Sequence, residues 1–188
     1  LTGGLNNAAF QARYRELSKT MEPCSYSIVL LNVRGFKLVN EQFGIPTGNQ
    51  TLSYIYRVLK QHVRQAQDEF VARGESDHFF LCLKEYTQAA LQCRLNEMIH
   101  DINTFQDTDL PFLALSFKQG ACLVNDPDQE ITLLQDHARL ALQNSGTDIR
   151  HECSFYNESL TRHLKLEQEL NALFEDSIEN RHFQVYLQ

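Results

Sequence analysis

The chain has 188 residues, 43% of them hydrophobic, and a formal net charge of −7. This length and composition favour one folded globular domain with an appended segment. The acidic balance and the lack of a Lys/Arg cluster argue against a nucleic-acid partner. No apolar run approaches the ~20 residues that cross a bilayer, so we expect no membrane contact by this segment.

The cysteines and the first residue bear on the cellular setting. Leu1 is not a start methionine, so we expect the chain to be a piece of a longer protein. The five cysteines are odd in number and include no CxxC pair, which argues against a disulfide framework or a zinc site. We therefore predict a reducing, cytoplasmic location.

The first half of the chain alternates between helical and strand patterns. A helix is predicted over about 6–21, and the near-continuous apolar run 26–33 predicts a strand buried on both faces. A short helix over about 36–43 should end at Gly44, and Pro46 can start the next helix.

The middle of the chain predicts a β-hairpin, because the polar stretch 74–78 separates two apolar runs. Helical spacing of apolar residues then predicts helices over about 91–105 and 131–141. Between them, 112–124 reads as strand, with a bulge at Gly120. Helices segregated against a sheet that contains a hairpin predict an α+β sandwich.

The C-terminal part predicts a second, incomplete domain. The stretch 146–152 is the best boundary, so we divide the chain into 1–152 and 153–188. A long helix should begin near Asn157, a good N-cap residue, and the run 183–188 alternates like a strand that lacks a partner. The apolar stripe of this helix would consist of Leu160, Leu164, Leu170, Leu173 and Ile178.

Few residues suggest chemistry on their own. His78 follows Asp77 in the predicted turn, where a metal or acid/base role competes with an ordinary solvated turn. Lys37 and Asn40 follow the first strand, where they could meet a phosphate and a base edge, although an exposed helix start explains them equally well.

An ordered set of short blocks resembles the GGDEF family of diguanylate-cyclase-like domains. The blocks are Leu1-Thr2-Gly3 with Asn6 for LTGLxNR, residues 32–41 for DxDxFKxxND, 44–49 for GHxxGD, 72–79 for ARxGGDEF and 135–138 for ADxA. The resemblance implies a nucleotidyl-cyclase palm-like fold. Such a fold has a central, mainly antiparallel sheet flanked by helices, and its signature lies on a hairpin.

A second resemblance covers the C-terminal segment. Residues 166–173 and 183–188 look like the opening helix and first strand of an EAL-type phosphodiesterase domain. This similarity implies a linker helix followed by an EAL domain. That downstream EAL domain, in the same chain, would be the partner of the first domain.

The GGDEF resemblance implies a chemistry that this sequence has largely lost. An active member joins two GTP molecules with the help of divalent metal. The family's metal-binding aspartate falls on Asn32, and a second carboxylate of that block falls on Arg34. The signature becomes Glu75, Ser76, Asp77, His78 and Phe79, in which only Asp77 still provides an acid that could bind metal.

The nucleotide contacts are partly retained. The resemblance suggests Phe36, Lys37, Asn40 and Asn49 as nucleotide-binding residues. The late phosphate-binding positions fall on Gln143 and Thr147. The family's product-inhibition RxxD sequence falls on residues 66–69, which lack the arginine and keep only Glu69 as the acid.

These substitutions predict a catalytically inactive regulatory domain of a bacterial cyclic di-GMP signalling protein. It would act as a weak GTP sensor that controls the downstream EAL domain, with Mg²⁺ present only if GTP is bound. One alternative is an active diguanylate cyclase with altered metal and phosphate ligands. A second is a structural dimerisation module, and a homodimer is compatible with each interpretation.

Overall fold

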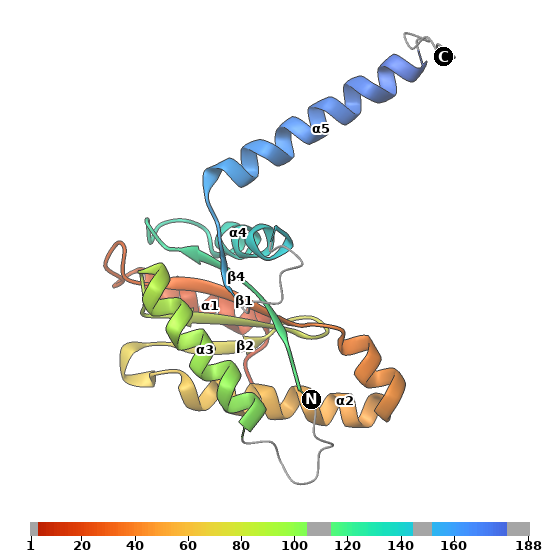
Figure 1. Cartoon of the computed structure of the whole chain (residues 1–188). Coiled ribbons are helices and arrows are strands. Elements are labelled where there is room, and N and C mark those ends of the chain that lie inside the picture. The colour runs from red at the N-terminus through yellow and green to blue at the C-terminus, as the bar shows by residue number, and fades with distance from the viewer. Residues whose placement is uncertain (1–3, 105–113, 145–151, 180–188) are drawn as a thin grey trace. The chain divides into compact units, whose positions relative to one another are not determined.

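The computed structural model describes residues 4–104, 114–144 and 152–179, with the side chains of Leu164 and 175–179 excepted (Figure 1). The elements in chain order are α1 (Asn7–Ser18), β1 (Ser27–Val33), α2 (Phe36–His62), the 3-10 helix η1 (Gln65–Gln67), β2 (Phe70–Arg73), β3 (His78–Leu83), α3 (Gln88–Thr104), β4 (Phe117–Leu123), α4 (Ile131–Gln143), β5 (Ser154–Phe155) and α5 (Glu158–Glu179).

The strands form one sheet in the order β2-β3-β1-β4-β5. All neighbouring pairs are antiparallel except β4 and β5, which are parallel. This arrangement confirms the predicted α+β fold with a central, mainly antiparallel sheet. The hairpin of β2 and β3 lies at one edge of the sheet, and β1 lies in the middle.

Helices cover both faces of the sheet, as the continuous apolar pattern of β1 predicts. Val29 and Leu31 pack in a core cluster with α2 and α3. Ile28 and Leu30, on the opposite face of the same strand, pack in a second cluster with α1 and α4. In Figure 1, α3 lies in front of the sheet and α1 behind it.

Helix α2 consists of two helical segments that meet at Gly44. Gly44 has φ 84° and ψ 157°, which is not a helical conformation and which glycine adopts without a steric penalty. Pro46 follows in the first turn of the second segment. The predicted stop at Gly44 and restart at Pro46 are therefore confirmed, and the break lets residues near 40 and 48 face each other.

The predicted hairpin is also confirmed. Strands β2 and β3 pair from Phe70 opposite Cys82 to Arg73 opposite Phe79. The backbone N–H of Gly74 donates to the carbonyl of His78 at 2.8 Å, and the N–H of His78 donates to the carbonyl of Glu75 at 3.1 Å. Ser76 has φ 55°, so a residue other than glycine holds a left-handed position in this turn.

Strand β4 corrects two predictions. It starts at Phe117, so Ala114 to Ser116 are not strand, and residues 112–113 lie outside the described residues. Gly120 is not a bulge, because it stays in register opposite Leu30. Its role is close packing: a Cβ at Gly120 would lie 2.3 Å from the backbone oxygen of Ala138 in α4. The prediction of a strand was correct, but Gly120 is there because α4 packs closely against β4 at this position.

The end of the first unit lies beyond the predicted boundary at residue 152. Ser154 and Phe155 form β5 and pair with Gly120 and Ala121 of β4. The ring of Tyr156 stacks on that of His137, with 3.7 Å between centroids. Contacts divide the chain into compact units Leu1–Tyr156 and Asn157–Gln188.

The second unit contains α5, which begins next to Asn157 as predicted. The side-chain oxygen of Asn157 accepts a hydrogen bond from the N–H of Ser159 at 3.0 Å. Exposed apolar side chains follow at helical spacing, namely Leu166, Leu170, Leu173 and Phe174. The side chains of Leu164 and Ile178, and the predicted strand 183–188, lie outside the described residues.

Two further findings concern the setting of the chain. None of the helices in the described part of the chain combines the length and apolar character needed to cross a bilayer. All five cysteines are free thiols, and Cys82, Cys122 and Cys153 are buried among apolar side chains. Burial raises the pKa of the Cys122 and Cys153 thiols to about 12, so these two are unreactive packing groups.

Candidate functional site

The structure brings two substituted signature positions into contact. Asn32 lies near the end of β1, directly opposite His78 at the start of β3. The side-chain nitrogen Nδ2 of Asn32 is 3.4 Å from Nε2 of His78. The place where the family resemblance puts a metal-binding aspartate and a signature glutamate is therefore filled by an amide and an imidazole.

His78 has neighbours on its other ring nitrogen as well. Its Nδ1 lies 3.0 Å from the carbonyl oxygen of Glu75 and 3.7 Å from Oδ1 of Asp77. Nδ1 therefore faces oxygen acceptors, and Nε2 faces the side-chain amide of Asn32. We call Asn32, His78 and the turn Gly74–Asp77 the turn end of the hairpin.

The turn end does not fit a divalent cation. Magnesium prefers oxygen ligands, above all carboxylates, and the carboxylate that the structure places beside His78 is that of Asp77, at 3.7 Å. Across the described residues there is no group of three His, Cys, Asp or Glu side chains that could hold a metal ion. Asp77 alone, with Arg34 two residues after Asn32, makes a poor metal ligand set.

The last signature residue has a different role from its neighbours. Phe79 is 0% exposed and packs in the core cluster on the α2 and α3 face. Glu75 and Ser76 are exposed at the tip of the turn. The substituted part of the signature is therefore the part that is open to solvent.

Three of the four predicted nucleotide-binding residues gather around Gly48. A Cβ at Gly48 would lie 1.9 Å from Oδ1 of Asn40 and 3.2 Å from Cζ of Phe36, so both side chains pack directly on this glycine. Asn49 is the next residue of the chain, and its carbonyl accepts a hydrogen bond from Ser53. The break at Gly44 creates this arrangement, which places the amide of Asn40 against Gly48, next to Asn49 in the chain.

The other predicted contacts do not join this group. The side chain of Lys37 is 89% exposed, and its nearest charged partner is Glu41 at 3.6 Å. Gln143 is exposed near the end of α4, and Thr147 lies outside the described residues. Two of the predicted phosphate contacts are therefore exposed side chains, Lys37 and Gln143.

The acid of the product-inhibition sequence lies in the core of the domain. Glu69, the acid that this stretch keeps, is 0% exposed and pairs with Arg94 of α3. The two guanidinium nitrogens of Arg94 lie 2.5 and 2.6 Å from the two carboxylate oxygens. The N–H groups of Arg64 and Lys84 donate to the same carboxylate at 2.6 and 3.0 Å.

The charge of Glu69 is therefore fully compensated. Burial by itself would raise the pKa of this carboxyl, but the hydrogen bonds from Arg94 and from the two backbone N–H groups outweigh burial and lower the pKa below 4.5. Arg94 also donates to the carbonyl of His62 at 2.9 Å. We call Glu69, Arg94 and the two N–H donors the open end of the hairpin.

Sequence reasoning missed Arg94, although the pattern contained a signal. Arg94 lies between Leu91 and Leu95 on the apolar face of its helix, and only 6% of it is exposed. Arginine is almost never buried without a partner. An arginine at a core position therefore indicates a buried acid elsewhere, and Glu69 is that acid.

The fold and the turn end together define a class of protein. A mainly antiparallel sheet with helices on both faces, and a polar turn on its edge hairpin, is the arrangement of nucleotidyl-cyclase-like domains. The family model described as diguanylate cyclase, GGDEF domain, matches residues 1–151. The chain therefore belongs to the GGDEF domain family.

One curated relative and several solved structures are similar to the chain. The cyclic di-GMP phosphodiesterase NbdA of Pseudomonas aeruginosa is 25% identical over 200 residues, which cover 100% of this chain and 24% of NbdA. The chain thus spans about a quarter of the length of this relative.

The solved structures are similar in fold. Diguanylate cyclase SiaD of Pseudomonas aeruginosa, in complex with its activator SiaC, has a TM-score of 0.70 at 22% identity, covering 82% of this chain and 59% of SiaD. The GGDEF domain of YfiN (TpbB) from the same species also has a TM-score of 0.70, at 19% identity, covering 87% of this chain and 96% of that domain. DgcB of Caulobacter crescentus, in complex with c-di-GMP, has a TM-score of 0.68 at 19% identity and 82% coverage of each chain.

Proposed function

We propose that this chain is a catalytically silent GGDEF domain that regulates a cyclic di-GMP signalling protein. The Asn32–His78 contact carries the proposal, because it places an amide and an imidazole where a diguanylate cyclase needs metal-binding carboxylates. The similarity to the phosphodiesterase NbdA and to the cyclase SiaD supports the signalling context.

The chemistry explains why these changes silence the domain. Attack on the α-phosphorus of GTP needs a metal ion that neutralises triphosphate charge and orients the reacting groups. The turn end offers the amide of Asn32, the imidazole of His78 and the carboxylate of Asp77 beside it. The cation of Arg34, two residues after Asn32, would oppose a metal ion. The exposed side chains of Glu75 and Ser76 add bulk, and in Glu75 negative charge, where phosphates would have to approach.

The direct test is turnover of GTP by the purified chain with Mg²⁺ or Mn²⁺, followed by chromatography of the products. We expect no cyclic di-GMP from the native chain. The variant Asn32→Asp/Glu75→Gly/Ser76→Gly/His78→Glu rebuilds the signature and serves as the positive comparison. Turnover by the native chain that Asp77→Ala abolishes would overturn the proposal in favour of an active cyclase with altered ligands.

We further propose that the region around Gly48 keeps a weak affinity for guanine nucleotides. Amide groups of Asn40 and Asn49 can hydrogen-bond a base edge, but phosphate contacts are few, so the affinity for GTP should be modest. Gly48→Ala should displace Asn40 and weaken GTP binding in calorimetry, with Lys19→Gln, an exposed lysine at the end of α1, as a control that leaves the region intact. If the native chain binds no GTP, the sensor idea fails and the dimerisation module should replace it.

The output of such a sensor would pass through α5 to a downstream EAL domain. Exposed apolar residues such as Leu166 and Leu170 provide a face on which another domain can pack. Leu164→Pro should kink α5 at a cost of about 3 kcal/mol and uncouple GTP from phosphodiesterase activity in the full-length parent. If GTP changes that activity equally in parent and variant, α5 is not the link.

A further inference from the structure

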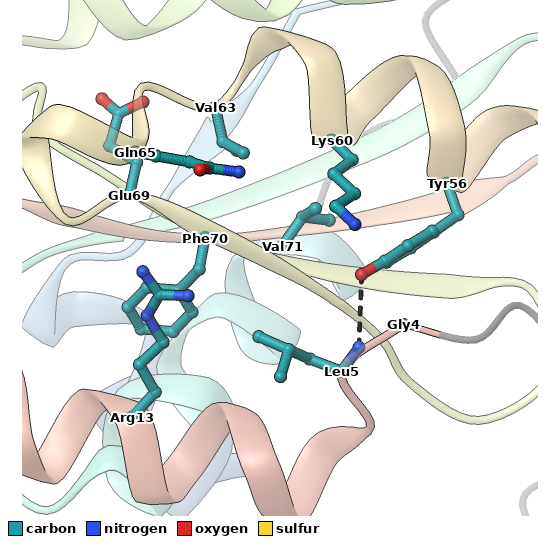
Figure 2. Close-up of a pocket in the computed structure, with 10 residues that line it drawn as sticks. All are labelled: Gly4, Leu5, Arg13, Tyr56, Lys60, Val63, Gln65, Glu69, Phe70 and Val71. Carbon is teal, nitrogen blue, oxygen red and sulfur yellow. Dashed lines mark hydrogen bonds between the residues drawn. The ribbon is translucent and has the colours of Figure 1, made fainter.

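A pocket of about 420 Å³ lies between α1, α2 and the edge strand β2, away from the turn of the hairpin (Figure 2). We propose that this pocket binds a small organic anion that carries a flat ring and a phosphate group. Its size lies within the usual range for small-molecule sites.

The floor of the pocket is apolar and firmly placed. Phe70 and Val71 of β2 are each 2% exposed over the whole residue and belong to the two core clusters on opposite faces of the sheet. Leu5 pairs with Ala72 along the outer edge of β2, and its carbonyl accepts a hydrogen bond from Arg73 at 3.0 Å. This side of the pocket is therefore held in place by the core, and a ligand would contact mainly the exposed side chains that border it, such as Arg13 and Lys60.

Two cations enter the pocket from different helices. In Figure 2, Lys60 extends from α2 and Arg13 from α1 toward β2. Neither of them forms an ion pair within the part of the chain that the structure describes. Glu69 also borders the pocket, but its charge is balanced by Arg94. The pocket is thus locally positive in a chain whose net charge is −7, which is an arrangement that selects anions.

The remaining groups indicate what the anion should look like. The guanidinium carbon of Arg13 lies 4.8 Å from the centroid of the Phe70 ring, so Phe70 holds one face of the guanidinium and the other face can stack on a planar ligand. The Tyr56 hydroxyl oxygen accepts a hydrogen bond from the N–H of Leu5 at 3.2 Å, which leaves its proton available for donation. A Cβ at Gly4 would lie 2.1 Å from the Tyr56 ring, so glycine is what lets this ring lie against the chain.

The test is an NMR titration of the chain with adenosine monophosphate, compared with adenosine and with inorganic phosphate. We expect adenosine monophosphate to shift the amide signals of Phe70 and Val71 and to bind more tightly than either fragment. Arg13→Gln and Lys60→Gln should each weaken binding about tenfold, the usual loss of one charged hydrogen bond. Lys19→Gln removes an exposed charge at the other end of α1 and should change nothing.

Each alternative outcome is decisive. The proposal fails if adenosine monophosphate gives no shifts up to about 5 mM, or if the two variants bind as well as the native chain. If inorganic phosphate binds as tightly as the nucleotide, the ring contributes nothing to binding, and the proposed ligand class is wrong. Shifts centred on Asn40 and Asn49 would assign binding to the region around Gly48, which refutes the pocket and leaves the GTP-sensor proposal intact.

Discussion

The two ends of the edge hairpin differ in the side chains that meet there. At the open end, Glu69 is a buried carboxylate with four hydrogen bonds from Arg94 and two backbone N–H groups. At the turn end, amide and imidazole nitrogens of Asn32 and His78 meet at 3.4 Å. The open end therefore holds a buried, compensated charge, whereas an amide and an imidazole face each other at the turn end.

This difference shows that an acid can be kept because the fold needs it, whether or not a function needs it. A buried carboxylate with a bidentate arginine cannot be removed without leaving an unpaired buried charge. A carboxylate at an open turn can be replaced at little cost to stability, because solvent and neighbours satisfy whatever replaces it. Substitutions that change function without unfolding the chain are therefore expected at the turn end, and not at Glu69.

The largest expected effect comes from breaking the open end. Arg94→Met leaves Glu69 buried without its partner and should destabilise the chain by about 3–5 kcal/mol. Urea denaturation followed by circular dichroism measures the change. The double variant Glu69→Met/Arg94→Met should lose clearly less than Arg94→Met alone, since no uncompensated charge remains. Equal losses in the two variants would contradict the ion-pair account.

The pH dependence of stability sharpens the same contrast. The folded pKa of Glu69 lies below its ordinary value of 4.5, so its stabilising contribution is complete above about pH 5 and is lost as the pH falls through the folded pKa. Glu69→Gln lacks this titration. The difference in unfolding free energy between the native chain and Glu69→Gln should therefore shrink as the pH falls from 5 to about 2. A difference that stays constant over this range would show that Glu69 does not titrate with folding.

A smaller effect is expected at the turn end. Asn32→Ala removes one half-buried hydrogen-bond partner of His78 and should cost about 1 kcal/mol in urea denaturation. The comparison between the two ends predicts that this loss is well below that of Arg94→Met. A loss of 3 kcal/mol or more would mean that Asn32 has a structural role comparable to that of the buried ion pair.

The smallest effect is a gain. Ser76 holds φ 55° in the turn, a conformation that costs a non-glycine residue about 1 kcal/mol. Ser76→Gly relieves this strain but also frees the unfolded chain, so we expect a stabilisation of no more than about 1 kcal/mol. Ser76→Ala is the matched control and should not stabilise. A loss of stability in Ser76→Gly would show that the serine side chain compensates for its own backbone.

The sequence predicted the fold well where the spacing of apolar residues agrees with the glycine, proline and polar residues that end an element. The apolar run of β1, the break at Gly44 and the polar turn 74–78 each indicate a local structure that the chain adopts. The bulge predicted at Gly120 was wrong. A glycine in a strand is compatible with a bulge or with close packing, and only the position of α4 decides between them. The short β5 was missed since two residues carry no periodicity.

The candidate site was predictable only in part. The family blocks located Asn32, Asn40 and His78, and the structure brings Asn32 and His78 together. Sequence order could not show that Asn40 packs on Gly48, because this contact depends on the turn at Gly44. Nor could it pair Glu69 with Arg94, which are 25 residues apart and meet only through packing of α3 beside the hairpin.

Strand β5 affects how this domain can be produced as a fragment. The N–H of Tyr156 donates to the carbonyl of Ala121, so the stretch 154–156 covers the outer edge of β4. A recombinant fragment cut at residue 151, where the family match ends, would lose this cover and the buried thiol of Cys153. Uncovered strand edges recruit other chains. Such a fragment should aggregate on concentration, whereas one that extends through Tyr156 should stay dispersed.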